Sequence, residues 1–242
     1  SIFTELLSHM IPRLHRKLRR EVNEAVYLID ATSVRLNELS ASWARFSDGV
    51  CGIKAHVIYD PDADCPTYLS VTPSRINDIT AAKAMPIVPG ASYVFDLGYY
   101  DFRWWADLHE AGCRIVTRFK THTPLIDAEK RPLPADSHIL SDQIGWLPRR
   151  QKHSRQNPFA APVREIRVRI ETGKILRILS NDLSSEASVI ADLYKRRWAI
   201  ELFFKWIKQT LKIKKFIGTS ENAIRIQIAI AMIAFLLLRL AQ

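Results

Sequence analysis

The stretch from Tyr194 to Lys208, YKRRWAIELFFKWIK, decides how this chain is interpreted. Four of its polar residues, Tyr194, Arg197, Glu201 and Lys208, follow one another at intervals of three, four and seven. In an α-helix, at about 100° per residue, they fall on one stripe roughly 60° wide. We therefore predict one helix that presents a carboxylate among groups that bind phosphate.

Apolar residues of the same region project to the other side of the predicted helix: Ile200, Phe203, Ile207 and Leu211. A polar stripe opposite an apolar one is common to surface helices, so it is not specific. Ordinary ion pairs four residues apart, between Arg197 and Glu201 or between Glu201 and Lys205, explain the charged stripe equally well. The helix alone does not decide between the two interpretations.

Two aspartates elsewhere in the chain each end a short apolar run. Asp30 follows Val26–Ile29 in YLIDATSVRL, and Asp96 follows Tyr93–Phe95 in SYVFDLGYYDF. In an α/β core this pattern predicts a carboxylate at the carboxyl end of a strand, where such folds carry their sites. The structural alternative is a turn residue at a strand end. Glu201 could reach the two aspartates only through tertiary folding.

Together these three blocks resemble the signature of IS4-family transposases. The pattern is Tyr, two residues, Arg, three residues, Glu, six residues, Lys, and the two aspartate blocks precede it in the required order. GIKAH (52–56) and FFKWIKQTLKIKKFIGTSENA (203–223) also look like family sequence. The resemblance covers roughly Asn23 to the C-terminus. Because the chain opens on Ser1 and closes on an uncapped helical pattern, we expect that it is truncated at both ends.

The resemblance implies that Asp30, Asp96 and Glu201 are the catalytic residues and the metal ligands of a DDE transposase. Three converging carboxylates repel one another, and a divalent cation compensates that repulsion. Hard oxygen ligands that leave room for water and phosphate suit Mg²⁺ or Mn²⁺. We expect two ions about 3.5–4 Å apart, as in other enzymes that catalyse in-line displacement at phosphorus.

The order of predicted elements supports a mixed α/β fold, and the resemblance implies a ribonuclease H-like core. The predicted elements are strands at 25–32, 52–60 and 66–73, a helix at about 78–85 capped by Asp78, a strand at 93–96, a helix at about 101–111 capped by Asp101, and a strand at 114–119. Six prolines and an alternating pattern around Thr172 and Gly173, typical of an exposed hairpin, mark a β-rich insertion. We predict three parts: 1–119 as the first part of the core, 120–182 as the insertion, and 183–242 as the rest of the core with the catalytic helix and a buried C-terminal helix.

A further set of residues is predicted to contact DNA: Tyr194, Arg197, Lys205, Lys208, Lys54, His56, Trp146, Arg149 and Arg150. Lys54 and His56 match the family's second-strand motif; otherwise they pack or pair on a sheet face. The basic cluster RRQKHSRQ (149–156) is either a DNA-contacting loop or a solvated charge run. Trp146 either stacks on an extruded base or packs in the insertion's own core. Leu97 stands where the family usually has arginine, so a positive group beside Asp96 is missing.

Composition is consistent with a cytoplasmic protein that binds a polyanion, and the resemblance implies a bacterial protein associated with the nucleoid. The 242 residues carry 35 lysines and arginines against 25 aspartates and glutamates, a net charge of +10, which favours a polyanionic partner. The three cysteines are scattered, which indicates neither a disulfide framework nor a zinc site. The longest apolar run, 228–238, is too short to span a membrane, and no membrane partner is expected.

The sequence therefore predicts an IS4-type DNA transposase that cleaves DNA at element ends and transfers strands. Its expected partners are double-stranded DNA, as transposon ends and as target, and a second copy of the chain in a homodimer. The alternative is a truncated, inactive DNA-binding remnant that interferes with intact transposase. Another ribonuclease H-like nuclease, such as a resolvase, does not explain the Tyr-Arg-Glu-Lys helix.

Overall fold

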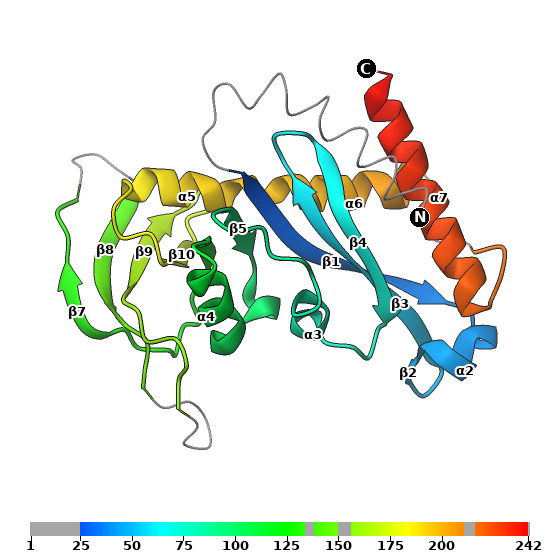
Figure 1. Cartoon of the computed structure of the whole chain (residues 1–242), viewed down its shortest axis with the longest axis horizontal. Coiled ribbons are helices and arrows are strands. Elements are labelled where there is room, and N and C mark those ends of the chain that lie inside the picture. Colours follow the sequence, from blue (N-terminus) through cyan, green and yellow to red (C-terminus); the bar gives the residue numbers. More distant parts are fainter. Residues whose placement is uncertain (1–24, 134–137, 150–155, 211–215, 242) are drawn as a thin grey trace. The chain divides into compact units, whose positions relative to one another are not determined.

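The structure is a computed structural model that describes residues 25–133, 138–149, 156–210 and 216–241 (Figure 1). The chain divides into two compact units. Unit 1 comprises Ser1–Met85 and Trp198–Gln242, and unit 2 comprises Pro86–Arg197. Each unit is described by itself below. The predicted three-part division, with boundaries at 119 and 182, remains a prediction.

Unit 1 contains an antiparallel sheet in which β3 (Val50–Asp60) is the central strand. Strand β3 pairs with β1 (Val26–Leu36), with β4 (Cys65–Pro73) and with the short β2 (Arg45–Ser47). These ranges confirm the three strands predicted from extended runs of sequence. Two short helices, η1 (Glu38–Ser40) and α2 (Ala41–Ala44), connect β1 to β2. A third, α3 (Asp78–Ala82), follows β4; its N-cap residue is Asn77, so the predicted cap at Asp78 is wrong.

Two helices complete unit 1, α6 (Trp198–Thr210) and α7 (Glu221–Leu240). Helix α6 packs against β1, and α7 packs against β4. The Phe203 ring of α6 contacts both the sheet and α7: its centroid lies 4.9 Å from that of Tyr59 on β3 and 5.0 Å from that of Phe235 on α7. Helix α7 is long and apolar enough to pass for a membrane span by composition. Only one of its faces is buried, while Ile226 and Ile230 are exposed, so the predicted buried C-terminal helix is buried only in part.

Unit 2 has a mixed sheet that begins with two parallel strands. Strands β5 (Ser92–Phe95) and β6 (Arg114–Arg118) lie side by side, connected through η2 (Leu97–Tyr99) and α4 (Phe102–Glu110). Asp101 caps α4 by accepting a hydrogen bond from the Trp104 backbone N–H at 2.9 Å, as predicted. The mixed α/β class predicted from the sequence is confirmed.

The predicted insertion supplies the rest of the unit 2 sheet. Its strands run in the order β10 (Ile175–Ser180), β9 (Val163–Arg169), β8 (Ile139–Trp146) and β7 (Ile126–Lys130), and β10 pairs antiparallel with β6. The predicted hairpin around Thr172 and Gly173 is confirmed as β9–β10: its tip, residues 171–175, is exposed, whereas its other end, where β10 joins β6, is buried. Gly173 at its tip has a φ of +80°, a backbone conformation that glycine adopts at little cost.

The predicted continuous helix from Tyr194 to Lys208 is two helices. Helix α5 (Ala187–Arg196) ends before Arg197, and α6 begins at Trp198. Arg197 keeps a right-handed helical backbone, with φ −53° and ψ −26°, and its N–H donates to the Tyr194 carbonyl at 3.1 Å. A bond to the third preceding residue tightens the turn. Neither glycine nor proline occupies this position, so no residue type in the sequence marks the break.

Candidate active site

Asp96 lies directly after the parallel strand β5, as predicted. It is half-buried, and its Oδ1 accepts a hydrogen bond from the Gly98 backbone N–H at 2.8 Å. The Thr117 hydroxyl of β6 donates to the Asp96 carbonyl oxygen at 3.4 Å. The Gly98 backbone N–H and the Thr117 hydroxyl therefore hold Asp96 at the carboxyl end of a strand, the position at which α/β folds carry their sites.

Asp30 does not end its strand. Strand β1 continues to Leu36, and Asp30 stands within it, opposite Val57 of β3. The prediction of a strand-end carboxylate is wrong because residues 31–36 keep pairing with β3. Asp30 is half-buried, and its Oδ1 accepts from the Ala31 backbone N–H at 2.8 Å.

Glu201 stands in the first turn of α6. The apolar face of this helix is buried, as predicted, through Ile200, Phe203 and Ile207, while Glu201 is half-buried. Leu211 lies outside the described residues. Since α6 packs on β1, Asp30 and Glu201 belong to two elements of unit 1 that touch. The predicted third carboxylate, Asp96, belongs to unit 2.

The three carboxylates fit a hard divalent cation by the chemistry of their oxygens and by their partial burial. In the part of the chain that the structure describes, no group of three or more His, Cys, Asp or Glu side chains forms a metal-binding cluster. Asp30 and Glu201 supply two carboxylates within unit 1, and Asp96 supplies one within unit 2. Their joint use as ligands is part of the proposal below.

Tyr194 and Arg197 lie in unit 2 with Asp96. Tyr194 is buried, and the Arg197 guanidinium carbon lies 5.8 Å from the centre of its ring. Burial raises the pKa of the Tyr194 phenol, Arg197 and Arg118 lower it, and Asp96 raises it again. Tyr194 is buried in contact with Arg197, and its contact with DNA stays a prediction. These charged groups are within electrostatic reach of one phenol.

Arg118 is the residue that sequence reasoning missed. It ends β6 one residue beyond Thr117, which pairs with Phe95 in the parallel register, so Arg118 and Asp96 follow neighbouring strands at the same edge. Its side chain is exposed. The signal in the sequence is weak, because Thr117 separates Arg118 from the apolar run Ile115–Val116, whereas Asp96 directly follows its own run.

Lys54 and His56 both make polar contacts within unit 1. The Lys54 Nζ lies 3.0 Å from Asp78 Oδ1, and His56 bonds the Thr72 hydroxyl at 2.8 Å. His56 is fully buried. Burial lowers the pKa of His56 to about 4, against the raising effect of Asp78. The prediction that His56 contacts DNA is therefore wrong, and the packing alternative describes both residues.

The other residues predicted to contact DNA differ in how far their side chains are exposed. Trp146 ends β8 and is 42% exposed, so both its stacking on a base and its packing in the insertion stay predictions. Arg149 and Lys205 are exposed, and Lys208 is half-buried. Arg150 and most of the basic cluster, through residue 155, lie outside the described residues.

Comparison with known proteins gives a family for this arrangement. Residues 23–237 match the family model described as a transposase DDE domain. The chain is 37% identical over 241 residues to y4zB of Sinorhizobium fredii, which is assigned as a transposase, covering 100% of this chain and 67% of the relative. It is 28% identical over 242 residues to the protein assigned as transposase of insertion sequence element IS5377 from Geobacillus stearothermophilus, covering 98% and 63%.

A solved structure shares the fold. The piggyBac transposase in a synaptic complex with hairpin DNA superposes with a TM-score of 0.51 at 11% identity, covering 87% of this chain and 45% of that one. This likeness agrees with the ribonuclease H-like fold that the resemblance implied. The chain spans about two thirds of the length of its curated relatives. From the family match across most of its length, the chain belongs to the DDE transposase family.

Proposed function

We propose that this protein is an IS4-type transposase that cleaves DNA strands at element ends and joins them to a target. One observation carries the proposal: within a DDE transposase domain, carboxylates stand on β1, after β5 and in the first turn of α6. Asp30, Asp96 and Glu201 are proposed to converge and to hold Mg²⁺ or Mn²⁺. When bound, two such ions activate the attacking oxygen and stabilise the leaving oxygen.

Arginines beside Asp96 are proposed to orient the DNA backbone. Arg197 lies over Tyr194, and Arg118 reaches the same phenol from the end of β6. A guanidinium binds a phosphate through two parallel hydrogen bonds, which fixes direction as well as distance. Arg118 would thereby replace the arginine that the family usually has at the position of Leu97.

Further contacts are proposed along the DNA. Lys205 and Lys208 on α6 act as point charges for phosphates, and Arg149 does so beside the insertion. The exposed Trp146 is proposed to stack on a base that leaves the duplex, a contact of about 1–3 kcal/mol. The piggyBac complex contains hairpin DNA, and a hairpin intermediate in this protein would require such an extruded base. A homodimer on DNA and a place at the bacterial nucleoid complete the proposal.

The test is a nicking assay on a DNA duplex that carries the inverted repeats flanking the gene. We expect cleavage only with Mg²⁺ or Mn²⁺, and none with Asp30→Asn, Asp96→Asn or Glu201→Gln. Asp107→Asn is the matched control, since Asp107 is an exposed carboxylate on α4 that pairs with Arg103. Normal cleavage by one of the three variants would remove that residue from the site. Binding without cleavage by the unaltered protein would favour the inactive remnant.

Trp146→Ala tests the stacking contact separately. The proposal requires near-normal nicking of the first strand and slower formation or resolution of a hairpin. Equal impairment of both steps, together with a lower melting temperature, would show that Trp146 only packs.

A further inference from the structure

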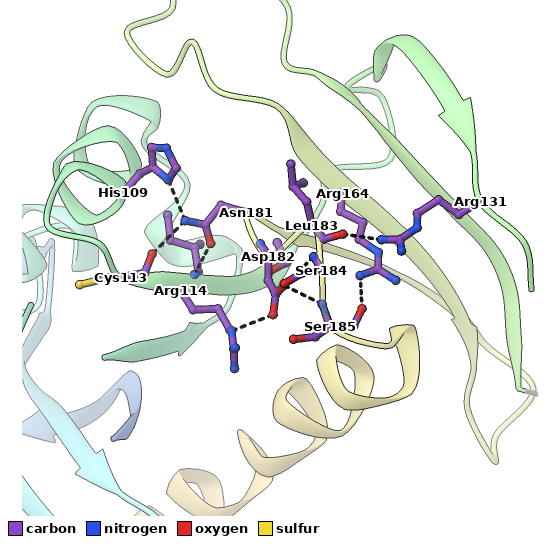
Figure 2. A network of polar contacts seen from close by, with 12 residues as sticks. His109, Cys113, Arg114, Arg131, Arg164, Asn181, Asp182, Leu183, Ser184 and Ser185 are labelled. Atoms are coloured by element: carbon purple, nitrogen blue, oxygen red, sulfur yellow. Dashed lines mark hydrogen bonds and ion pairs between the residues drawn. The ribbon is translucent and has the colours of Figure 1, made fainter. Parts of the chain in front are cut away.

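The loop Asn181–Ser185, which we call the clamped loop, connects β10 to α5 and is held from two sides (Figure 2). It precedes Glu186, the N-cap residue of α5, which makes no capping hydrogen bond through its side chain. The start of α5 is therefore not fixed by its own cap. Its position depends on the contacts of the clamped loop and on the packing of its buried face, Ala187, Ile190, Leu193 and Tyr194, against the strands of unit 2.

One side of the clamped loop is fixed to the start of β6 and to the residue that precedes it. The Asn181 side chain accepts from the Ile115 backbone N–H at 2.7 Å and donates to the Cys113 carbonyl at 2.8 Å. Asp182 Oδ2 lies 2.9 Å from Arg114 Nε. Burial would raise the pKa of Asp182, but hydrogen bonds from Ser185 and Ser184 and the charge of Arg114 lower it to about 2.

The other side is fixed by arginines of the insertion. Arg164 on β9 donates from Nη1 to the Ser185 carbonyl at 2.5 Å, and Arg131 donates to the Leu183 carbonyl at 2.5 Å. Figure 2 shows these two arginines reaching the loop from the side of the insertion strands. Arg164 uses its other two nitrogens for Asp142 on β8, with both N–O distances 2.7 Å. One guanidinium thus joins two insertion strands to the loop.

The Arg164–Asp142 pair is costly to bury, because Arg164 is 1% and Asp142 4% exposed. Desolvation of two charges offsets most of their attraction, and well-packed apolar residues in place of such a pair often leave stability unchanged or higher. Stability alone therefore does not account for the pair. What apolar side chains cannot provide is the third hydrogen bond, which fixes the Ser185 carbonyl.

Helix α5 carries this constraint to the candidate site. Its ten residues span about 15 Å, and the far end bears Tyr194 and the adjoining Arg197. A helix whose first turn shifts moves its last turn with it. Within unit 2, Asp96 is held by β5 and β6, so a shift of the clamped loop that moves α5 would change where Arg197 stands relative to Asp96.

We propose that Arg164, with Asp142, is a positioning residue through which the β-rich insertion sets the placement of α5, and so of Tyr194 and Arg197, for DNA cleavage. This inference rests on the proposed function. Arg164 touches neither DNA nor metal in this scheme. It acts through the backbone of the clamped loop.

The test compares two variants that remove a salt bridge without changing net charge. Arg164→Met combined with Asp142→Leu removes the buried pair and the bond to Ser185. Arg225→Met combined with Glu221→Leu removes an exposed pair on α7 and serves as control. Arg164→Lys retains the charge beside Asp142 but loses the guanidinium fork. For each purified protein, amide hydrogen exchange of residues 187–196, the melting temperature and the single-turnover nicking rate at saturating DNA are measured.

We expect the Arg164/Asp142 variant to keep its melting temperature, exchange α5 amides at least about tenfold faster, and nick about 10–100-fold more slowly, since small displacements of this kind cost up to about 10²-fold. Arg164→Lys should fall between it and the unaltered protein, and the α7 control should match the unaltered protein. Unchanged α5 exchange at an unchanged melting temperature would overturn the positioning role, whether or not DNA is cleaved. Faster exchange with a normal nicking rate would overturn its importance for cleavage. If even the unaltered protein fails to nick, the proposed function fails, while the exchange data still decide whether Arg164 positions α5.

Discussion

Helices α5 and α6 divide the signature residues between them and are held in different ways. Helix α6, with Glu201, is fixed to unit 1 by apolar packing in which Phe203 contacts Tyr59 and Phe235. Helix α5, which leads to Arg197, is preceded by a loop fixed through hydrogen bonds and ion pairs of Arg164, Arg114 and Asn181. Apolar packing is sensitive to mutations that remove side-chain volume, because they leave a cavity. A set of hydrogen bonds and ion pairs is sensitive to mutations that remove a correctly oriented donor or acceptor. Mutations that loosen the two helices should therefore change the free energy of unfolding in different ways.

The largest expected effect is on the packing of α6. Phe203→Ala should lower the free energy of unfolding by about 3–5 kcal/mol, because it removes a buried ring and leaves a cavity. Leu202→Ala, at an exposed neighbour on the same helix, should change it by less than about 0.5 kcal/mol. Urea unfolding measures both. Similar values for the two would mean that packing does not hold α6.

For the buried pair that holds the clamped loop, removing both partners should destabilise the protein less than removing one. Arg164→Met alone leaves the buried Asp142 without its bidentate partner and should cost about 3 kcal/mol, since Arg131 Nε at 4.0 Å compensates weakly. Adding Asp142→Leu should recover most of that loss. A double-mutant cycle by urea unfolding gives the interaction energy. A double variant as unstable as the single one would mean that the pair stabilises unit 2 by packing, as Phe203 does unit 1.

The same difference explains how much could be predicted from the sequence. The buried face of α6 follows from helical periodicity, so Ile200, Phe203 and Ile207 were predicted correctly. Asp96 was placed correctly because a strand-end carboxylate leaves a local pattern. The clamped loop leaves none, because Arg164 and its partner Ser185 are 21 residues apart and Arg131 and Leu183 are 52 apart.

The misplacements have physical causes of the same kind. Asp30 was expected at a strand end because its apolar run stops there, yet backbone pairing with β3 continues regardless of side-chain polarity. His56 was expected to be available, but its imidazole is fully buried and bonds the Thr72 hydroxyl through Nε2. The break at Arg197 has no local signal in the sequence, because neither of the usual helix-breaking residues occurs there.

The two units should lose stability over different pH ranges as the solution is acidified. His56 has a pKa of about 4 in the fold and an ordinary value of 6.5, so between these values the unfolded state binds a proton that the folded state excludes. Unit 1 should therefore lose stability as pH falls from about 6.5 to about 4. The pKa of Asp182 in unit 2 shifts from 3.8 to about 2, so its contribution disappears only as pH falls through that lower range.

Amide exchange of β3 and β10 at pH 7, 5 and 3.5, corrected for intrinsic rates, measures the two units separately. Protection in β3 should fall first. His56 faces Thr72, Asp78 and Lys54, and His56→Gln can retain the bond to Thr72 without titrating. Its β3 protection should be flatter between pH 6.5 and 4. A parallel loss of protection in β3 and β10 would show that the buried imidazole does not govern the acid response.

The smallest effect should distinguish the two helices as DNA-binding elements. Arg118→Ala removes a cation at the end of β6 in unit 2, within electrostatic reach of Tyr194, and Lys205→Ala removes an exposed one from α6 in unit 1. Removing one cation that binds a phosphate should flatten the slope of log affinity against log salt by about 0.9. Because a guanidinium aligned by its neighbours also orients the phosphate, Arg118→Ala should in addition slow nicking at saturating DNA, whereas Lys205→Ala should change the slope alone. Fluorescence anisotropy at several salt concentrations, combined with single-turnover nicking, measures both quantities. Equal slopes and equal nicking rates in the two variants would assign Arg118 to general attraction of DNA, and the positive group missing at Leu97 would then have no replacement from β6.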